Sequence, residues 1–263
     1  MLRAIDHIVI LVRDLAQASA DYERAGFTVT PGGTHAAGTT HNALISFADG
    51  TYFELIAFFE PDRPQEHRWW SRGAQGDGLV DYALLSSDLA ADCAAMRSQG
   101  LSPQGPDDGG RLRPDGERLV WRSAMLGRGN NHPALPFVIE DVTPRDLRVP
   151  GGDATHHRLP VTRVAGLTVV TADLAAGADA LAALLGTTGE SATTAEGTGQ
   201  RFTIGRQWLL LVQPAAGSDA GRHLAARGDG PYEIALSSDS GTSPGQGELL
   251  PADQTHGARI RVA

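Results

Sequence analysis

The sequence predicts an α+β fold in which a unit of one strand, one helix and three strands, βαβββ, repeats along the chain. Three observations predict it. Short runs rich in β-branched residues alternate with turns, an Asp-Leu pair after such a run begins a helix, and this opening recurs along the 263 residues. The 32 glycines and 15 prolines are concentrated between apolar runs, which favours short strands and turns over long helices.

The first unit illustrates the pattern. Residues 5–12 (IDHIVILV) form a strand, and Asp14 caps a helix in which Leu15, Ala18 and Tyr22 share one face. Gly26 stands where a left-handed residue would end that helix. Three further strands are expected, with a hairpin turn between the last two, at residues 27–30, 43–47 and 52–58.

Three later copies of the opening have different lengths. The second begins at Leu79 and the third at Val164, and each leads through an Asp-Leu pair into a helix that a glycine ends. The fourth begins at Tyr232, but the Gly/Ser/Pro-rich residues 240–247 leave no room for a full helix. We therefore expect an N-terminal pair of modules at 1–148 with the candidate site, a linker at 149–160 and a degenerate C-terminal pair at 161–263.

Bulk composition narrows the function classes. There are 22 basic and 31 acidic residues, a net charge of −9, and no basic run, so nucleic acid is not an expected partner. No apolar run is long enough to span a bilayer, and the amino terminus reads directly into a strand without a charged leader. Cys93 is the only cysteine, which excludes an internal disulfide framework and a cysteine-rich zinc site. A cytoplasmic monomer or homodimer that binds a small molecule is expected.

Two polar residues stand inside apolar strands of the first unit. His7 shares a strand face with Ile5 and Val9, and Glu54 lies in the middle of the strand at 52–58. An ionised carboxylate buried without a partner costs several kcal/mol, so Glu54 is expected to be protonated, paired or exposed in a solvated cavity. When the Asp-Leu steps at Asp14 and Asp88 are aligned, Asp81 takes the position of His7 in the second unit.

The segment from Pro31 to Asn42 is predicted as a loop over the mouth of a cavity, because its glycines permit unusual backbone angles. His35 and His41 are the candidates for cavity groups there and, with Glu54, for the catalytic side chains. Thr39 and Asn42 are interpreted as bonding their own backbone. Among the residues outside this loop, Arg113 and Arg145 are given structural roles, the tryptophans at 69, 70 and 121 either line a pocket or pack in the core, and the His pair at 156–157 is given no role.

A family resemblance rests on four motifs of the first unit, with weaker matches at 113–116 and 135–137 that extend to about residue 212. The four motifs are DHIV at 6–9, GGTH at 32–35, GTTHN at 38–42 and YFELI at 52–56. They resemble the vicinal-oxygen-chelate superfamily, in its glyoxalase-like domain branch. The resemblance implies repeated βαβββ modules that form two curved mixed sheets, of the glyoxalase/bleomycin-resistance/dihydroxybiphenyl-dioxygenase-like type.

The same resemblance implies a metal site. Superfamily enzymes place metal ligands on the first and last strands of a module, positions that His7 and Glu54 occupy, and Asp81 would be a third ligand. The fourth position falls on Phe137, which cannot bind a metal. One imidazole and two carboxylates suit Mn, Fe, Mg or Zn and leave positions open for substrate. The alternative is that His7 and Glu54 only bond one another and that Asp81 pairs with an arginine or lies at an exposed strand start.

Two function classes remain open at this point. The first is a divalent-metal-dependent isomerase or lyase acting on a small oxygen-chelating substrate, with a ring-cleaving dioxygenase less well matched because it resembles a two-His, one-carboxylate site. The second is a metal-free protein that sequesters a small antibiotic-like molecule, which Phe137 favours. In the second half, Gly166 and Leu209 stand at the positions of His7 and Glu54, so that half is expected to have kept the fold and lost the ligands.

Overall fold

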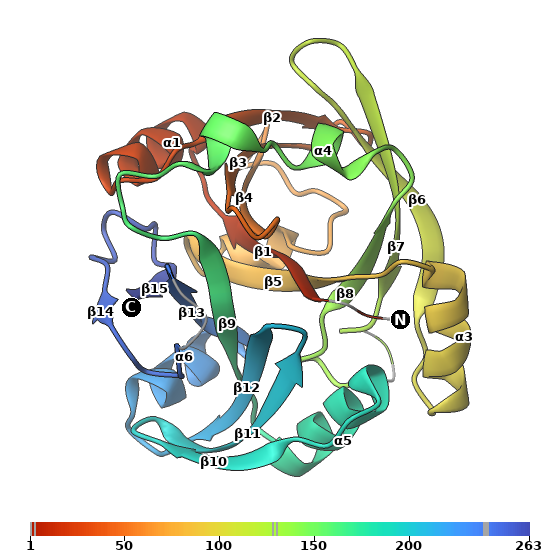
Figure 1. Ribbon diagram of the computed structural model, residues 1–263, viewed down its shortest axis with the longest axis vertical. Helices are drawn as coiled ribbons and strands as arrows, with labels where there is room; N and C mark the ends of the chain where they lie inside the picture. Colours follow the sequence, from red (N-terminus) through yellow and green to blue (C-terminus); the bar gives the residue numbers. More distant parts are fainter. Residues whose placement is uncertain (1, 3, 128, 130, 239–241) are drawn as a thin grey trace.

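The fold is α+β with two mixed sheets, the first of them closed into a barrel (Figure 1). A computed structural model describes residues 2, 4–127, 129, 131–238 and 242–263. The barrel strands are β1 Ala4–Leu11, β2 Thr30–His35, β3 Thr40–Ser46, β4 Tyr52–Phe58, β5 Gly78–Leu85, β6 Gln104–Leu112, β7 Arg118–Met125 and β8 Phe137–Asp141. The helices among them are α1 Leu15–Arg24, α2 Trp70–Gly73, α3 Leu89–Ser98 and α4 Arg145–Arg148. The α+β fold class and the curved mixed sheets predicted from the sequence are confirmed.

The barrel joins the first two modules. Its strand order is β1-β4-β3-β2-β6-β7-β8-β5, and the two junctions between modules, β1 with β5 and β2 with β6, are antiparallel. Within the modules, β1 runs parallel to β4 and β5 parallel to β8. Because the sheet closes on itself, its inward-facing side chains surround one interior space. Module one therefore faces module two, which brings the strands of His7 and Asp81 side by side.

The second sheet is built from the C-terminal modules, in the order β10-β11-β12-β9-β13-β15-β14. Its elements are β9 Arg163–Val170, α5 Leu174–Leu185, β10 Glu190–Thr194, β11 Gly197–Ile204, β12 Gln207–Pro214, α6 Asp219–Arg227, β13 Gly230–Ser237, β14 Glu248–Leu249 and β15 Arg259–Val262. Residues 242–247, between β13 and β14, contain no helix, as expected for the shortened fourth module. Across the described ranges, no helix is long and apolar enough to cross a membrane.

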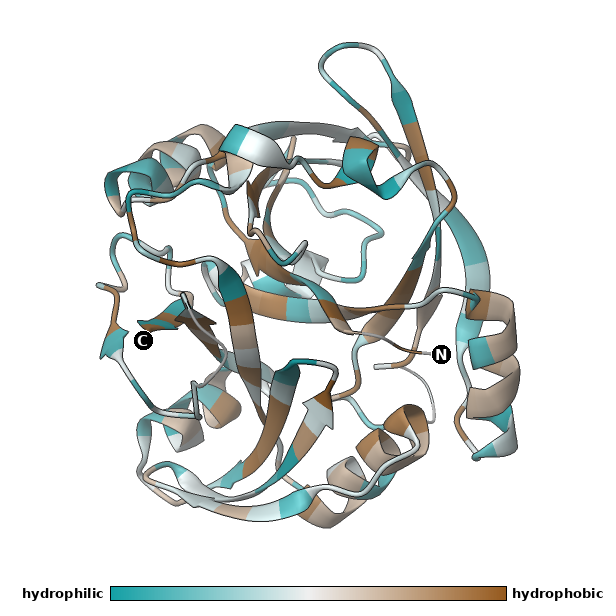
Figure 2. Cartoon of the chain, in the orientation of Figure 1, coloured by the Kyte–Doolittle hydropathy of each residue, from teal (hydrophilic) through white to brown (hydrophobic). Residues whose placement is uncertain are grey.

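One apolar core joins the two sheets. Ile8 and Ile10 of β1 belong to the same buried cluster as Leu167 and Val169 of β9, and Figure 2 shows hydrophobic residues concentrated in these strands. The short helix α4 and a 3₁₀ turn at Gly152–Thr155 lie between the two sheets in sequence. The division into 1–148, 149–160 and 161–263 stays a prediction. Since the outer face of β1 is buried against the second sheet, its inner face is left to line the barrel interior.

A β-bulge in β1 changes one predicted face. The pairing of β1 with β5 shifts register between Ile5 and His7, so that Asp6 is the extra residue. Ile5 therefore packs in the outer core with Ile8, whereas Val9 faces the barrel interior. The expectation that Ile5 shares a face with His7 is wrong for this reason. The bulge also places the carboxylate of Asp6 beside the ring of His7, and the two side chains form a hydrogen bond.

The predicted loop from Pro31 to Asn42 is instead a β-hairpin. β2 pairs with β3 from Thr30 through Thr34, and only residues 36–39 form the connecting turn. Gly32 and Gly33 serve a bulge, since the register shifts between Pro31 and Gly33 and Gly33 has φ of +135°. Gly38, with φ of +70°, lies in the connecting turn. The predicted strand at 27–30 consequently begins later, at Thr30.

The position that corresponds to His7 in the second half is filled by a neighbouring ring. A Cβ at Gly166 would lie 2.1 Å from a ring carbon of Trp208, which is buried on the adjacent strand β12. We expect Gly166→Ala to lower the free energy of unfolding by about 1–3 kcal/mol, because the methyl group overpacks this contact. Urea denaturation measures it.

Gly151→Ala is the matched control for this prediction. Gly151 has an extended φ of −108°, and nothing lies within 4 Å of the added methyl group. The free energy of unfolding should then change by less than about 0.5 kcal/mol. Equal effects of the two substitutions would contradict the packing of Trp208 against Gly166.

Candidate functional site

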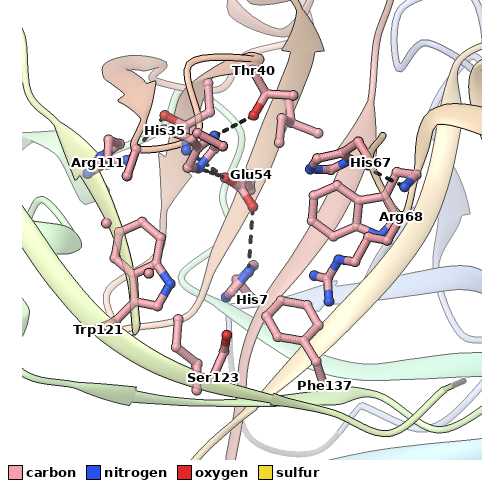
Figure 3. A pocket seen from close by; sticks show the side chains of 18 of the residues that line it. His7, His35, Thr40, Glu54, His67, Arg68, Arg111, Trp121, Ser123 and Phe137 are labelled. Carbon is pink, nitrogen blue, oxygen red and sulfur yellow. Dashed lines mark hydrogen bonds and ion pairs between the residues drawn. The ribbon is translucent and has the colours of Figure 1, made fainter. Parts of the chain in front are cut away.

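A cavity of about 260 Å³ lies inside the barrel. Its polar side is lined by His7, His35 and Glu54, and aromatic side chains form other parts of its wall (Figure 3). The aromatic residues are Trp69, Trp121 and Phe137. A concave site in which an aromatic wall faces converging polar groups is typical of small-molecule binding.

Glu54 is the centre of the polar side. Its side chain is 8% exposed, and one carboxylate oxygen, Oε1, accepts a hydrogen bond from Asn42 Nδ2 at 2.6 Å and lies 3.2 Å from His35 Nε2. The other oxygen, Oε2, lies 3.6 Å from His7 Nε2. Burial alone would raise the pKa of the Glu54 carboxyl, but His35, His7 and Asn42 outweigh burial and hold the pKa below its ordinary value. Glu54 is therefore an ionised carboxylate inside the barrel.

Asn42 reaches Glu54 because Gly32 makes room for it. Antiparallel pairing sets Leu44 opposite Glu54, and Asn42 lies two residues along β3. A Cβ at Gly32 would lie 2.0 Å from Asn42 Oδ1, so only glycine leaves space for the amide. Arg111 Nη1 donates to Asn42 Oδ1 at 3.3 Å, which turns the amide N–H toward Glu54. The interpretation of Asn42 as bonding its own backbone is wrong.

His7 is oriented by Asp6. His7 Nδ1 lies 2.6 Å from Asp6 Oδ2, and the imidazole stacks on Tyr52 with ring centres 4.6 Å apart. Burial would raise the pKa of Asp6, but Arg148, the hydrogen bond from His7, and Arg145 hold it well below its ordinary value. An ionised Asp6 can only accept a hydrogen bond, so His7 Nδ1–H donates to it and His7 Nε2 is directed at Glu54. Arg145 thus has the structural role predicted for it.

His35 completes the cluster from β2. Its Nδ1 lies 2.9 Å from Thr40 Oγ1, and its Nε2 faces Glu54. The ring meets Trp121 edge-on, with ring centres 6.1 Å apart. His35 therefore links the carboxylate to the aromatic wall of the cavity.

The structure does not bring His41 or Asp81 into this cluster. The side chain of His41 points to the face of β3 opposite Thr40 and Asn42, which line the cavity. It stacks on Phe59, with ring centres 4.3 Å apart. Burial and the neighbouring His35 lower the pKa of His41. Asp81 Oδ2 accepts from Trp69 Nε1 at 2.9 Å and lies 3.7 Å from Arg68 Nη2. Asp81 thus pairs with an arginine, one of the alternatives left open by the sequence.

The donor set does not fit the metal site that the resemblance implies. His7 and Glu54 face one another, but Asp81 is engaged elsewhere and Phe137 occupies the fourth position. Ala83, the residue that pairs with His7 on β5, offers no donor. Among the residues with described positions, no group of three or more His, Cys, Asp or Glu side chains could hold a metal ion.

Several residues of the site were missed from sequence. Asp6 orients His7, Arg148 holds Asp6 in place, and Arg68 lines the cavity from the connection between β4 and β5. Asp6 stands next to a histidine inside an apolar strand, and this pattern could have indicated a carboxylate that orients the imidazole. Arg68 follows no strand pattern, so its sequence position gave no indication of the cavity. Trp69 and Trp121 line the cavity, as one of the two interpretations held, whereas Trp70 does not.

Comparison with known proteins places the chain in a family. The model of the glyoxalase-like domain family matches residues 5–185. A search of curated proteins finds no significant match.

Solved structures with the same fold cover nearly the whole chain. A hypothetical protein from Staphylococcus aureus is 13% identical, with a TM-score of 0.74 over 100% of this chain and 99% of its own. A mutant of 4-hydroxymandelate synthase from Streptomyces coelicolor is also 13% identical, with a TM-score of 0.59 over 91% of this chain and 72% of its own. At these identities the likeness concerns the fold alone. Since the family model covers more than half of the chain, the protein belongs to the glyoxalase-like domain family.

Proposed function

We propose that this protein is a glyoxalase-like enzyme of the isomerase or lyase type, which moves a proton on a small molecule held in the barrel cavity. One observation carries the proposal. The ionised carboxylate of Glu54 lies between two imidazoles, His7 and His35, on the wall of the barrel cavity. Carboxylate and imidazole side chains within reach of a bound molecule are the usual agents of general acid–base catalysis.

The proposed step is proton abstraction beside a carbonyl group. Glu54 accepts the proton, and the electron pair of the broken C–H bond moves toward the carbonyl oxygen to give an enolate. The proton then returns to the same or the neighbouring carbon, or a leaving group departs. The hydrogen bonds to Glu54 make it a weak base, and His35 donates one of them. The abstracted proton therefore passes from Glu54 to Nε2 of His7, which lies 3.6 Å from Oε2 and whose other ring nitrogen bonds Asp6.

The size and walls of the cavity support a small substrate. A volume of about 260 Å³ lies below the range of roughly 300–1,000 Å³ that holds drug-sized ligands. Polar groups on one side and Trp121 and Phe137 on the others suit a molecule with oxygen atoms at one end and an apolar body.

Solvent-deuterium exchange tests the proposal without knowledge of the natural substrate. The probes are small 2-hydroxyketones and 2-oxo acids, with and without a phenyl ring, incubated in D₂O and followed by proton NMR. We expect enzyme-dependent loss of the signal of the hydrogen beside the carbonyl for at least one probe. Binding of probes with no exchange above the buffer rate would contradict the proposal.

The second candidate is a metal-free protein that sequesters a small molecule. Phe137, which occupies a metal-ligand position of the superfamily, and the aromatic wall favour it. It predicts tight binding of an apolar ligand with no exchange at any carbon, so the same NMR experiment separates the two candidates.

Metal analysis bears on the divalent ion that the resemblance implies. Because the donor set is incomplete, we expect protein purified without an affinity tag to contain less than one ion of Mn, Fe, Mg or Zn per chain, and exchange to survive a chelator. Elemental analysis by mass spectrometry measures the content. A stoichiometric ion that is lost in both His7→Ala and Glu54→Gln would contradict this and restore the metal-dependent alternative.

A further inference from the structure

We infer that Arg68, held between Trp69 and Phe137, binds a carboxylate of the substrate, so that the cavity takes small aryl-substituted carboxylic acids. The inference deepens the proposed function and rests on it, because the bound acid is a substrate only if the protein is the proposed enzyme. As a binding site it stands on its own geometry. Its basis is a guanidinium on the side of the cavity opposite the His35 side of the polar cluster (Figure 3).

The guanidinium of Arg68 is positioned by two aromatic faces. Its central carbon lies 4.1 Å from the ring centre of Trp69 and 4.1 Å from that of Phe137, and its side chain is 17% exposed. Stacking of this kind orients the planar group, because the cation is attracted to the ring faces while its N–H groups lie in its own plane. Arg68 lines the cavity together with both rings.

Asp81 supports the position of Trp69 and Arg68 without forming a close hydrogen bond to the guanidinium. Its Oδ2 accepts from Trp69 Nε1 at 2.9 Å, and its Oδ1 accepts from the backbone N–H of Tyr82 at 2.9 Å. The same Oδ2 is 3.7 Å from Arg68 Nη2, beyond hydrogen-bond distance. Arg68 Nη1 also donates to the sulfur of Met125. A guanidinium has five N–H donors, and we infer that a ligand carboxylate forms two parallel bonds with Arg68 beside these contacts.

Charge in the cavity orients such a ligand. Glu54 is an ionised carboxylate, which repels an anion from the polar cluster, and Arg68 attracts it to the other side. An acid bound in this way directs its apolar body past Phe137 and Trp121 and its central carbon toward Glu54 and His7. A volume of about 260 Å³ limits that body to about one ring.

The test compares an acid with its neutral isostere. Binding of phenylacetate and of phenylacetamide is measured by calorimetry in the unsubstituted protein, because the charge of Glu54 is part of the proposed arrangement. We expect the acid to bind at least about tenfold more tightly than the amide, and Arg68→Gln to weaken the acid by about 10–100-fold and the amide by less than about threefold. Arg68→Lys should give an intermediate loss for the acid, because an ammonium keeps the charge without the planar fork.

Arg63→Gln is the matched control. Arg63 lies in the same connection, is 73% exposed and pairs with Glu60, so its loss removes the same charge outside the cavity. The affinity of the Arg63→Gln variant for phenylacetate should stay within about twofold of the affinity measured with Arg63 in place. The inference is overturned if acid and amide bind equally, if neither binds, or if Arg63→Gln and Arg68→Gln weaken the acid alike.

The result is distinguishable from a failure of the proposed function. An acid preference that depends on Arg68, in a protein that exchanges no proton, supports the subsite and refutes the enzyme. Proton exchange that depends on Glu54, with no preference for acids, refutes the subsite and keeps the enzyme.

Discussion

Replacing Glu54 with glutamine should lower the rate of enzyme-dependent proton exchange by a factor of about 10²–10⁴, the usual contribution of a positioned general base. Glutamine has nearly the same size, and its oxygen can still accept the hydrogen bond from Asn42. It cannot take up a proton, and it has no negative charge to stabilise a proton on the imidazole of His7. The rate constant for exchange, measured by NMR on the fastest probe, gives the factor.

Glu60→Gln is the control for this substitution. Glu60 follows the same strand, and its side chain is 58% exposed and pairs with Arg63 at the surface. Its loss removes an equal charge without touching the cavity, so the exchange rate should be unchanged. An exchange rate for Glu54→Gln within threefold of the unsubstituted protein would remove Glu54 from the proposed mechanism.

Asp6→Asn should give the largest loss of stability of any single substitution considered. Asp6 is fully buried and lies between the guanidinium groups of Arg145 and Arg148, and Arg148 is itself 3% exposed. Removal of one partner from a buried ion pair costs about 3–5 kcal/mol, because the remaining charge stays buried. Asp141 still contacts both arginines, so we expect the lower end, about 3 kcal/mol, in the free energy of unfolding measured with urea.

The same carboxylate makes stability depend on pH. The pKa of Asp6 in the folded protein is well below its ordinary value, so its contribution is complete above the pKa of an unfolded Asp, about 4, and is lost as the pH falls through the lower folded value. The free energy of unfolding should therefore fall with pH below about 4 and do so less steeply in Asp6→Asn.

An exposed pair supplies the comparison for Asp6. Asp62 bonds Arg13 at 2.5 Å, but its side chain is 80% exposed. Asp62→Asn should leave the free energy of unfolding nearly unchanged, because solvent screens the pair. A loss for Asp6→Asn no greater than that for Asp62→Asn would show that the two arginines do not depend on Asp6.

Local pattern in the sequence was sufficient for the modules. Strand runs of β-branched residues, the capping Asp14, Asp88 and Asp173, and the glycines after the helices all depend on neighbours in sequence, and each of these aspartates accepts the predicted hydrogen bond from its helix. The glycines of β2 misled the prediction, because a bulge and a close approach need the same residue as a loop does.

The site could be predicted only in part, because its partners come from distant strands. Alternation along one strand sets Glu54 on the same face as Ile56 and Phe58, and the structure shows that this face is the inner one. It did not indicate that Asn42 and His35 would reach Glu54, nor that Asp81 would turn to Trp69. Those contacts depend on register, on a bulge at Asp6 and on a connection without regular structure.

The structure of the Glu54→Gln variant in complex with the probe that exchanges fastest tests the central claim most directly. The account predicts that the exchanging carbon lies about 3–3.5 Å from the side chain at position 54, the range of a near-attack arrangement, with the ring of His7 on the same side of the ligand. A probe bound with that carbon directed away from position 54, or outside the barrel, would contradict it.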